Sequence, residues 1–457
     1  MKNSLTQQLQ DLLGHDNVLL DPAECLAYSY DNSRQQVLPI AVVFAQTHEH
    51  VVQTVQWCYE NQVPVTARGR GTGTPGGSVP LSNGIVLSLE RMQNIIAVHP
   101  DDRYLIAEAG VLNADCQHIA KQHGFFWPPD PTSMAYCTIG GNLAYNSAGP
   151  RAVKYGTPRE NTLGLTAVTG TGATLHTGVR TTKGVVGYDL TRLLIGSEGT
   201  LAIITSAILK LTPLPETRRT LRASYSSIQA ATNAIARIMA QPIVPYALEF
   251  MDTSAINVIQ QFTPFDLPNN TQAILIIEID GYENALPHHI HQLQQAASSD
   301  ELIDWQVATT KEEQDQLWKI RKSLSPCLRR LAPEKINEDV VVPVSQLPKL
   351  ISGLQTLSNK YAIPIVNFGH AGNGNIHVNL LYDSNNQQQV KNTLPCLDEV
   401  FNLVLALGGT LSGEHGIGLV KKPFVGRELD ATSLQLMRQI KQQFDPRNIL
   451  NPGKLFD

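Results

Sequence analysis

The fold of this chain is constrained most by short β-rich runs that alternate with helical runs from about Leu38 onward. IAVVFA, HEHVVQTVQWCYEN and VPVTARG follow one another in the order strand, helix, strand, which is typical of a β-α-β unit. Further strand-like runs are GIVLSL, YLIAEAG, LGLTAVTG and TLAIITSAILKLTPLP. Between them, VLNADCQHIAKQHG has the spacing of an amphipathic helix that ends on Gly124. The pattern predicts a fold that mixes helices and sheets.

Changes in composition divide the chain into four segments. SLTQQLQDLL has helical spacing behind Ser4 as a predicted N-cap, and Pro213, Pro215 and the run ETRR place a boundary near 215–219. Beyond that boundary ALEFM, AILIIEIDG, IVNFGH and IHVNLLYD alternate with helical stretches as far as CLDEVFNLVLALGG, which predicts an α+β domain. We therefore expect an N-terminal helical segment, a first domain, a second domain and a helical tail at 1–34, 35–215, 216–420 and 421–457.

Composition and charge exclude several classes of protein. Of the 457 residues, 42% are hydrophobic and 16% are charged, as expected of a folded globular chain. The net charge is −5 and the 35 basic residues form no clustered stripe, which argues against nucleic acid as the main partner. The six cysteines are dispersed without a C-x-x-C pair, which argues against a zinc ribbon or an iron–sulfur cluster in this chain and fits a reducing compartment.

The N-terminal sequence and the hydropathy of the chain bear on its location. MKNSLTQQLQDLLG lacks the apolar region of a secretory signal, and no run approaches the ~18 apolar residues of a membrane span. We expect a cytoplasmic protein without a membrane span, and leave open a peripheral position at the inner membrane face.

The densest glycine segment is VPVTARGRGTGTPGGSVP, residues 63–80. It contains a formal G-x-G-x-x-G at Gly71, Gly73 and Gly76. A dinucleotide-binding fingerprint must lead from a strand directly into a helix. Here Pro75 and Pro80 flank GGSV and the next run, GIVLSL, is a strand, so the segment predicts strand–loop–strand and argues against NAD.

The same loop carries chemistry suited to an anion. Closely spaced glycines let backbone N–H groups approach a phosphate, and Arg68 and Arg70 can add positive charge. A surface loop without a ligand is the alternative. A second cluster, DPTSMAYCTIGGNLAYNSAG, and a third, KGVVGYDLTRLLIGSEGTLAIIT, are rich in glycine and small polar residues that can lie close to a flat cofactor.

These segments carry a family resemblance. ARGRGTGTPGG, DPTS followed by TIGGNLAYNSAG, KYGTPRENTLGL and GYDLTRLLIGSEGTLAIIT resemble the FAD-binding domain of the p-cresol methylhydroxylase/vanillyl-alcohol oxidase flavoproteins. Within it they resemble the branch of D-lactate, glycolate and D-2-hydroxyglutarate dehydrogenases, over roughly residues 35 to 457. The resemblance implies a two-subdomain FAD-binding domain at 35–215, an α+β cap domain with an antiparallel sheet at 216–420, and a C-terminal helical tail that returns to the flavin.

The resemblance also implies the residues that contact FAD, with the pyrophosphate in the 68–78 loop. They are Arg68, Gly69, Arg70, Gly71, Thr72, Gly73, Gly76, Gly77, Ser78, Pro131, Thr132, Ser133, Gly140, Gly141, Asn142, Ala144, Asn146, Glu198, Gly199, Ile203 and Asn451. Relatives with covalent flavin often carry histidine where Thr72 stands, so we expect non-covalent FAD. Arg70 replaces the small residue of many relatives and is either a further phosphate contact or a solvated side chain.

A substrate carboxylate has a candidate partner in LWKIRKSLSPCLRRL. Arg321 and Ser325 share a helix face at i,i+4, and a guanidinium with a nearby hydroxyl suits a carboxylate. Composition alone favours an ordinary surface arginine, whereas the resemblance implies that Arg321 holds the substrate carboxylate. In the hydroxyglutarate branch a lysine lies two positions before this aspartate, whereas here Lys335 lies four positions before Asp339 and Asn337 stands two before it. The departure leaves the role of Lys335 unassigned and weakens the case for a dicarboxylic substrate.

GHAGNGNIHVN and LSGEHGIGLVKK supply a candidate metal site. His370, His377 and Glu414 are two imidazoles and a carboxylate, a common set for a divalent ion, although a single buried histidine is more often structural. H-x-G-x-G-N-x-H followed by G-E-H-G resembles the metal-site pattern of the hydroxyacid dehydrogenase branch. The resemblance implies zinc or manganese on these three residues, His415 as the base, and His415 and Asn379 beside the substrate.

Together the motifs predict an FAD- and metal-dependent dehydrogenase that oxidises a D-2-hydroxy acid, D-lactate first or glycolate, with hydride transfer to flavin N5. The electrons would leave to a quinone, a cytochrome, an electron-transfer flavoprotein or an iron–sulfur subunit. The alternatives are a D-2-hydroxyglutarate dehydrogenase, a metal-dependent hydrolase and a non-catalytic FAD subunit. The substrate, acceptor, metal and oligomeric state, including a possible homodimer, are not determined by these motifs.

Overall fold

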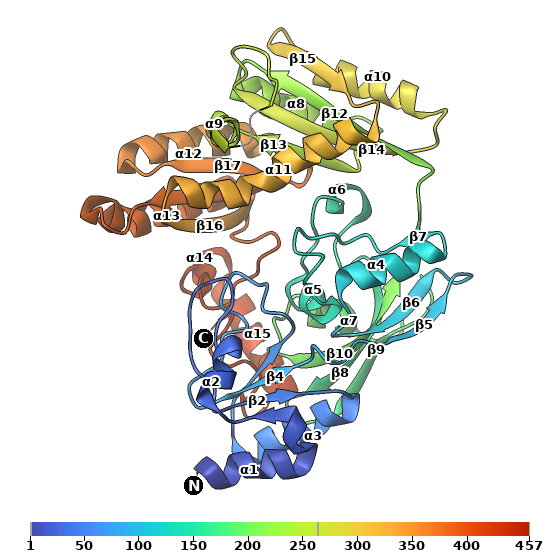
Figure 1. Cartoon of the computed structure of the whole chain (residues 1–457), viewed down its shortest axis with the longest axis vertical. Coiled ribbons are helices and arrows are strands. Elements are labelled where there is room, and N and C mark those ends of the chain that lie inside the picture. The colour runs from blue at the N-terminus through green and yellow to red at the C-terminus, as the bar shows by residue number, and fades with distance from the viewer. Residues whose placement is uncertain (1, 263–264, 457) are drawn as a thin grey trace. The chain divides into compact units, whose positions relative to one another are not determined.

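The computed structural model describes residues 2–262 and 265–456, and the chain divides into two compact units (Figure 1). The first unit comprises the chain up to Gly149, Gly156–Leu214 and the chain from Glu414 onward. The second unit comprises Pro150–Tyr155 and Pro215–Gly413. None of the helices in the described ranges is long and apolar enough to cross a membrane.

The predicted β-α-β unit is confirmed in the first unit as β2 (Ala41–Phe44), α3 (His48–Asn61) and β3 (Val65–Arg68). β2 and β3 both pair in parallel with β4 (Ile85–Ser88), which lies between them, and β1 (Val18–Leu19) completes the sheet beside β2. Apolar side chains of α3 and of these strands share one buried core. The carboxyl end of β3 therefore leads into the glycine-rich loop from a rigid sheet.

The N-terminal helix corrects one prediction. α1 (Lys2–Leu13) begins two residues before Ser4, so Ser4 is not its N-cap. A serine N-cap is worth only about 1 kcal/mol, which is not enough to determine where a helix starts.

A second sheet of the first unit is antiparallel, in the order β5-β6-β10-β8-β9. Its strands are β5 (Ile95–His99), β6 (Tyr104–Glu108), β8 (Thr162–Thr169), β9 (Thr174–Gly178) and β10 (Ala202–Lys210), and β7 (Phe125–Phe126) pairs separately with β11 (Thr212–Pro213). Other α-helices of this unit are α2 (Pro22–Cys25), α4 (Asn113–Gln122), α5 (Ile139–Tyr145), α7 (Leu190–Leu194), α14 (Val425–Glu428) and α15 (Ala431–Phe444). Gly124 follows α4 with a φ of 81°, as expected of a glycine after a helix end.

The C-terminal segment is part of the first unit through specific bonds. The backbone N–H of Asn451 donates to the Val65 carbonyl at 2.8 Å, and Leu450 forms a parallel bridge with Val65. Lys441 donates to the Thr200 carbonyl at 2.7 Å. The chain therefore returns to the first unit after about two hundred residues in the second unit.

The second unit is built on a seven-stranded antiparallel sheet in the order β15-β12-β14-β13-β17-β18-β16. The strands are β12 (Thr217–Tyr225), β13 (Ala247–Met251), β14 (Ala273–Gly281), β15 (Leu302–Val307), β16 (Glu334–Val341), β17 (Ile365–His370) and β18 (Asn375–Tyr382). This is the antiparallel sheet that the family resemblance implies for the second domain.

Helices cover this sheet in two groups. α9 (Thr253–Phe262) and α11 (Lys311–Leu331) share a buried cluster with Ile276 and Phe368, so both lie on the face to which these side chains point (Figure 1). α8 (Ile228–Ala240), α10 (Leu286–Ala297), α12 (Leu347–Tyr361) and α13 (Gln387–Ala406) contact one another in a second group. Polar residues on the α11 face are therefore partly shielded from water.

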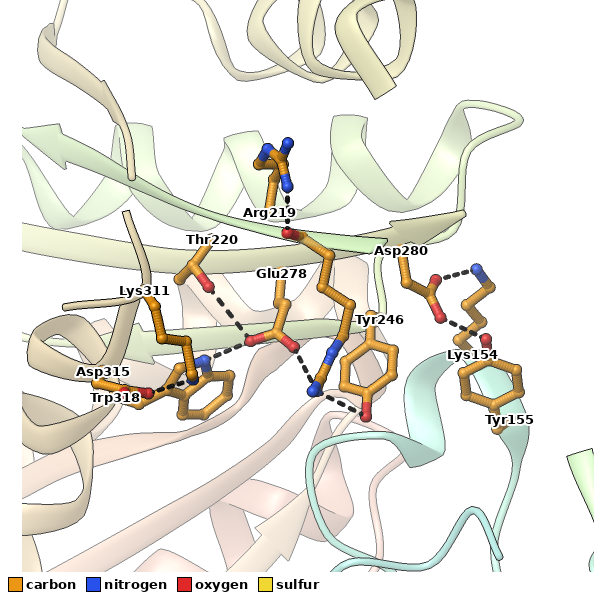
Figure 2. A network of polar contacts seen from close by, with 11 residues as sticks. Lys154, Tyr155, Arg219, Thr220, Tyr246, Glu278, Asp280, Lys311, Asp315 and Trp318 are labelled. Atoms are coloured by element: carbon orange, nitrogen blue, oxygen red, sulfur yellow. Dashed lines mark hydrogen bonds and ion pairs between the residues drawn. The ribbon is translucent and has the colours of Figure 1, made fainter. Parts of the chain in front are cut away.

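A short segment between two stretches of the first unit belongs to the second unit. Figure 2 shows Asp280 at the end of β14, where its carboxylate accepts hydrogen bonds from Lys154 and, at 2.5 Å, from Tyr155 Oη. Both partners lie in α6 (Ala152–Tyr155). Asp280 is 5% exposed, so this buried carboxylate anchors α6 to the sheet.

Candidate active site

The glycine-rich loop has the predicted strand–loop–strand context. β3 ends at Arg68 and β4 begins at Ile85, without an intervening helix. Gly71 and Gly76 have φ values of 64° and 82°, which favour glycine. The argument against a dinucleotide-binding fingerprint thus agrees with the structure.

The two arginines of this loop contact protein groups. Arg68 is buried, and its Nη1 donates to the Tyr30 carbonyl at 2.7 Å. Arg70 forms an ion pair with Glu90 at 3.5 Å. In this arrangement Arg68 fixes the shape of the loop, and burial lowers its pKa despite the nearby charge of Asp31.

Several glycines of the predicted cofactor site are packed so closely that a side chain would not fit. A Cβ at Gly77 would lie 2.1 Å from Tyr145 Oη, and one at Gly69 would lie 2.4 Å from Oγ1 of Thr138. Thr138 is the N-cap of α5 and accepts from the Gly141 backbone N–H at 3.2 Å. These contacts bring the 68–78 loop together with the second glycine cluster.

Asn451 connects the loop with the third predicted segment. Its Nδ2 donates to the carbonyls of Gly77 and Glu198, each at 2.8 Å, and its Oδ1 accepts from Thr66 Oγ1 at 3.2 Å and Lys454 Nζ at 2.7 Å. Asn451 and Glu198 both have positive φ, at 43° and 52°. Asn451, the tail residue that the resemblance implies, therefore holds two predicted cofactor-binding segments in fixed positions.

The Glu198 side chain binds the glycine turn that follows His415. Its carboxylate accepts from the backbone N–H groups of Ile417 at 2.6 Å and Gly418 at 2.8 Å. Burial raises the pKa of Glu198 to about 7, against the opposing effect of these two hydrogen bonds. A Cβ at Gly416 would lie 2.6 Å from the same carboxylate, so half-buried His415 is one residue from this cluster.

Other predicted cofactor residues hold neighbouring segments of the first unit. Asn142 Oδ1 accepts from Asn113 at 2.9 Å, and Asn146 Oδ1 accepts from Thr157 at 2.9 Å. Pro131–Ser133 forms the turn that leads toward Thr138, since the Pro131 carbonyl accepts from Met134 and the Ser133 carbonyl accepts from Tyr136 and Cys137.

In the second unit the two predicted metal-binding histidines lie close together. His370 ends β17, and His377 lies in β18 opposite Phe368, after a short turn. Their ring centroids are 5.3 Å apart. Gly374 closes the turn with a φ of 73°, and a Cβ there would lie 1.9 Å from the Val342 carbonyl oxygen. Only glycine can occupy this position without moving the hairpin.

The segment that leads to Glu414 is attached to the strand that pairs with His377. Asp339 faces His377 across β16 and β18, and its carboxylate accepts from the Gly413 backbone N–H at 3.0 Å. Glu414 is bonded to Gly413. One ligand atom each from His370, His377 and Glu414 lie within 4.8 Å of one another. The three residue types and this spacing suit a divalent ion such as zinc or manganese.

Two amide oxygens beside this group lack partners. Asn337 and Asn379 face each other on β16 and β18, two residues from the Asp339–His377 pair and on the same face. In the described part of the chain, the buried side-chain oxygen of each amide has no hydrogen-bond partner. Buried acceptors are normally satisfied, so the site fits a bound group that donates a hydrogen bond.

The predicted carboxylate-binding residue lies on the same sheet face. Arg321 projects from α11, stacks over Phe368 with its guanidinium carbon 4.8 Å from the ring centroid, and donates from Nε to Glu249 at 2.5 Å. Ser325 accepts from Lys335 Nζ at 3.2 Å. Lys335 thus contacts the second residue of the predicted pair.

Comparisons with known proteins identify the family. The family described as "FAD binding domain" matches residues 39–178, and "FAD linked oxidases, C-terminal domain" matches residues 214–455. The chain belongs to the FAD-linked oxidases. Its cofactor is accordingly FAD.

Relatives of this FAD-linked oxidase match over nearly their whole length. The glycolate oxidase subunit GlcD of Bacillus subtilis is 38% identical, with 98% of this chain and 96% of the relative covered. The D-lactate dehydrogenase of Archaeoglobus fulgidus is 36% identical, over 94% of this chain and 95% of the relative. The structure of p-cresol methylhydroxylase with substrate bound has a TM-score of 0.80 at 18% identity, covering 99% and 96% of the two chains, and shows the shared fold.

Sequence reasoning missed Glu249. Glu249 is the single charged residue of ALEFM, a strand whose five residues are all buried. A lone carboxylate within a buried strand must have a charged or hydrogen-bonding partner. That signal was present in the sequence, although it does not name the partners.

Proposed function

We propose that this FAD-linked oxidase is a divalent-metal-dependent dehydrogenase that converts a D-2-hydroxy acid into the 2-oxo acid, with D-lactate as the first candidate and glycolate as the second. Relatives named glycolate oxidase subunit and D-lactate dehydrogenase support this class of substrate. The observation that carries the proposal is the grouping of Glu414 with His370 and His377, which lie on adjacent strands, while Arg321 of α11 stacks over Phe368 of the same sheet.

Oxidation of a 2-hydroxy acid requires removal of the hydroxyl proton and of a hydride from C2. When bound, FAD accepts the hydride and a divalent ion withdraws electron density from the substrate oxygen. His370, His377 and Glu414 would hold that ion. Arg321 binds the substrate carboxylate through its guanidinium, and a ring nitrogen of His415 accepts the hydroxyl proton. Asn379 supplies a buried acceptor beside the substrate.

The remaining assignments concern the surroundings of the enzyme. FAD is bound without a covalent link, since Thr72 cannot form a histidyl bond. The electrons leave to an acceptor other than NAD: a quinone, a cytochrome, an electron-transfer flavoprotein or an iron–sulfur subunit. We place the enzyme in the cytoplasm, with a peripheral membrane position and a homodimer as open possibilities. D-2-hydroxyglutarate is the alternative substrate.

The decisive experiment is anaerobic mixing of the holoenzyme with D-lactate, L-lactate, glycolate and D-2-hydroxyglutarate while flavin absorbance is followed. D-lactate or glycolate should bleach the flavin fastest. Faster bleaching by L-lactate would contradict the stereochemistry, and faster bleaching by D-2-hydroxyglutarate would favour the alternative substrate.

The same samples separate the other classes of function. A coloured protein that none of the four acids bleaches would support a non-catalytic FAD subunit, and a colourless metalloprotein would support a hydrolase. Replacing His415 with alanine should preserve FAD and metal while abolishing bleaching, whereas His377→Ala should lose the metal. Normal metal content in His377→Ala would exclude its role as a ligand.

A further inference from the structure

Glu249 is a completely buried carboxylate that contacts two predicted site residues at once. It lies in β13, directly opposite His370 in β17, and is 0% exposed. Oε1 lies 2.5 Å from Nδ1 of His370, and Oε2 lies 2.5 Å from Nε of Arg321. Both carboxylate oxygens are therefore used, each by a different site residue.

The Arg321 guanidinium forms an ion pair with this buried carboxylate. A buried charge without such a partner would be strongly unfavourable. The hydrogen bond to His370 occupies the remaining carboxylate oxygen.

For His370, the contact selects one ring nitrogen. Because Nδ1–H donates to the carboxylate, Nε2 is the nitrogen that can coordinate an ion. A carboxylate behind a ligating imidazole also makes that imidazole a stronger ligand and fixes its ring plane.

For Arg321, the contact with Glu249 occupies Nε and leaves the edge of the guanidinium formed by the two terminal nitrogens for a ligand. Nε is occupied by Glu249, and Phe368 supports the guanidinium plane from one side. Among the residues that the structure describes, no hydrogen bond uses either terminal nitrogen of Arg321. These two parallel N–H donors are the pair that can bind a carboxylate in a bidentate manner.

We propose that Glu249 is a positioning residue that holds a metal-binding imidazole and the carboxylate-binding guanidinium in one fixed arrangement. The inference rests on the proposed function. It adds that the two ends of the substrate, the C2 oxygen and the carboxylate, are held by groups that share one buried carboxylate. Changing Glu249 should therefore weaken metal binding and carboxylate binding together, without affecting FAD.

Glu278 provides a matched control. It lies in β14 opposite Ala247 of β13 and is 5% exposed. Its carboxylate forms an ion pair with Arg218 at 3.2 Å. Figure 2 shows that it also accepts hydrogen bonds from Thr220 and Trp318. Both residues are buried glutamates of neighbouring strands that are paired with an arginine. Only Glu249 contacts a predicted metal ligand.

The test compares Glu249→Gln, Glu249→Asp and Glu278→Gln with the wild-type holoenzyme. Zn²⁺ and Mn²⁺ affinity is measured by titration, FAD content by absorbance, and KM separately from kcat with an artificial electron acceptor. Glu249→Gln should bind metal about 10 to 100 times more weakly and retain FAD. Its KM should rise, and Glu249→Asp should recover part of both losses because it keeps the charge. Glu278→Gln should match wild type in metal affinity.

Each outcome decides the proposal. Equal metal affinity in Glu249→Gln and Glu278→Gln would overturn the proposal. If both Glu249 variants fail to fold while Glu278→Gln folds, Glu249 is a structural residue only, and the proposal is also overturned. If Glu249→Gln fails to fold but Glu249→Asp folds, the metal affinity and KM of Glu249→Asp decide the question. Weaker metal binding in a protein that no hydroxy acid bleaches would support the positioning role and reject the proposed function.

Discussion

At the scale of single residues, the contact between Arg321 Nε and Glu249 leaves the two terminal nitrogens of Arg321 for the proposed substrate carboxylate. Nε donates to Glu249 at 2.5 Å, and a lysine at this position lacks the planar fork with which the terminal nitrogens can bind a substrate carboxylate in a bidentate manner. We expect Arg321→Lys to raise KM by about 10- to 100-fold, which corresponds to the ~1.5–3 kcal/mol of a hydrogen bond to a charged group. FAD content should not change.

Steady-state kinetics with an artificial electron acceptor measure this effect. Arg329→Lys is the matched control, because Arg329 lies in the last turn of the same helix and is exposed. An unchanged KM in Arg321→Lys would remove Arg321 from the substrate site.

The buried carboxyl of Asp252 should make the stability of the fold depend on pH. Asp252 accepts hydrogen bonds from the Ala255 backbone at 2.8 Å and Asn367 Nδ2 at 2.9 Å, yet burial raises its pKa from 3.8 to about 6. A carboxyl whose pKa is higher in the folded than in the unfolded state stabilises the fold at pH values below the unfolded-state pKa. This stabilisation is lost as the pH rises through the folded-state pKa of about 6. A difference of about two units between the folded-state and unfolded-state pKa corresponds to about 3 kcal/mol of folding free energy.

Asp252→Asn removes this titration. Between pH 4 and 7, the Tm of wild type should therefore fall relative to that of Asp252→Asn, by several degrees, given roughly 2–4 °C per kcal/mol for a unit of this size. Scanning calorimetry at both ends of the range measures the difference. A wild-type Tm that rises relative to the variant with increasing pH would contradict the assignment.

Residue types that carry chemistry were visible in the sequence where they stand among glycines, as His370 and His377 do. The partners of Glu249 were not visible, because Arg321 and His370 lie 72 and 121 positions away from it along the chain. The sheet order, which places β13 beside β17, brings Glu249 to His370, and the packing of α11 on the sheet brings Arg321 to Glu249. Periodicity and spacing contain no information about that order.

At the scale of elements, apolar patterns predicted several strands of the second unit closely, but not the polar β12 or the half-exposed β15. ALEFM, AILIIEIDG and IVNFGH coincide with β13, β14 and β17, since continuous apolar runs end where polar or glycine residues begin. Helix starts were less predictable, as α1 shows, because several residues near a terminus have similar capping preference.

The hairpin that carries the two histidines gives an element-scale prediction. Gly374→Ala should destabilise the second unit by several kcal/mol, because an L-residue at φ 73° costs about 1–2 kcal/mol and its Cβ would overlap the Val342 carbonyl oxygen. Metal affinity should fall as well, since the hairpin must shift.

Gly408→Ala separates the two causes. Gly408 has nearly the same φ, 74°, and a Cβ there meets nothing within 4 Å. The difference in Tm between the two variants therefore measures the steric overlap alone. Equal Tm values would show that the turn can move without cost.

At the scale of the whole molecule, the chain leaves the first unit at Leu214 and returns at Glu414. Composition suggested a helical tail for the last residues but could not show which unit receives it. The returning segment is held by buried contacts, since Ile449 and Leu450 belong to the core of the first sheet and Asn451 binds Gly77 and Glu198.

A chain that ends at Phe444 should therefore lose FAD while the second unit keeps its fold. The truncation removes Ile449 and Leu450 from the core and leaves the Gly77 and Glu198 carbonyls without the Asn451 amide, at ~1–3 kcal/mol for each unsatisfied group. The point variant Asn451→Ala should show a smaller loss of FAD affinity, because it breaks these hydrogen bonds and leaves the core intact. Flavin absorbance after gel filtration measures cofactor content, and limited proteolysis should still yield a resistant fragment near 215–413. Full FAD retention in the truncated chain would show that the first unit binds its cofactor without the returning segment.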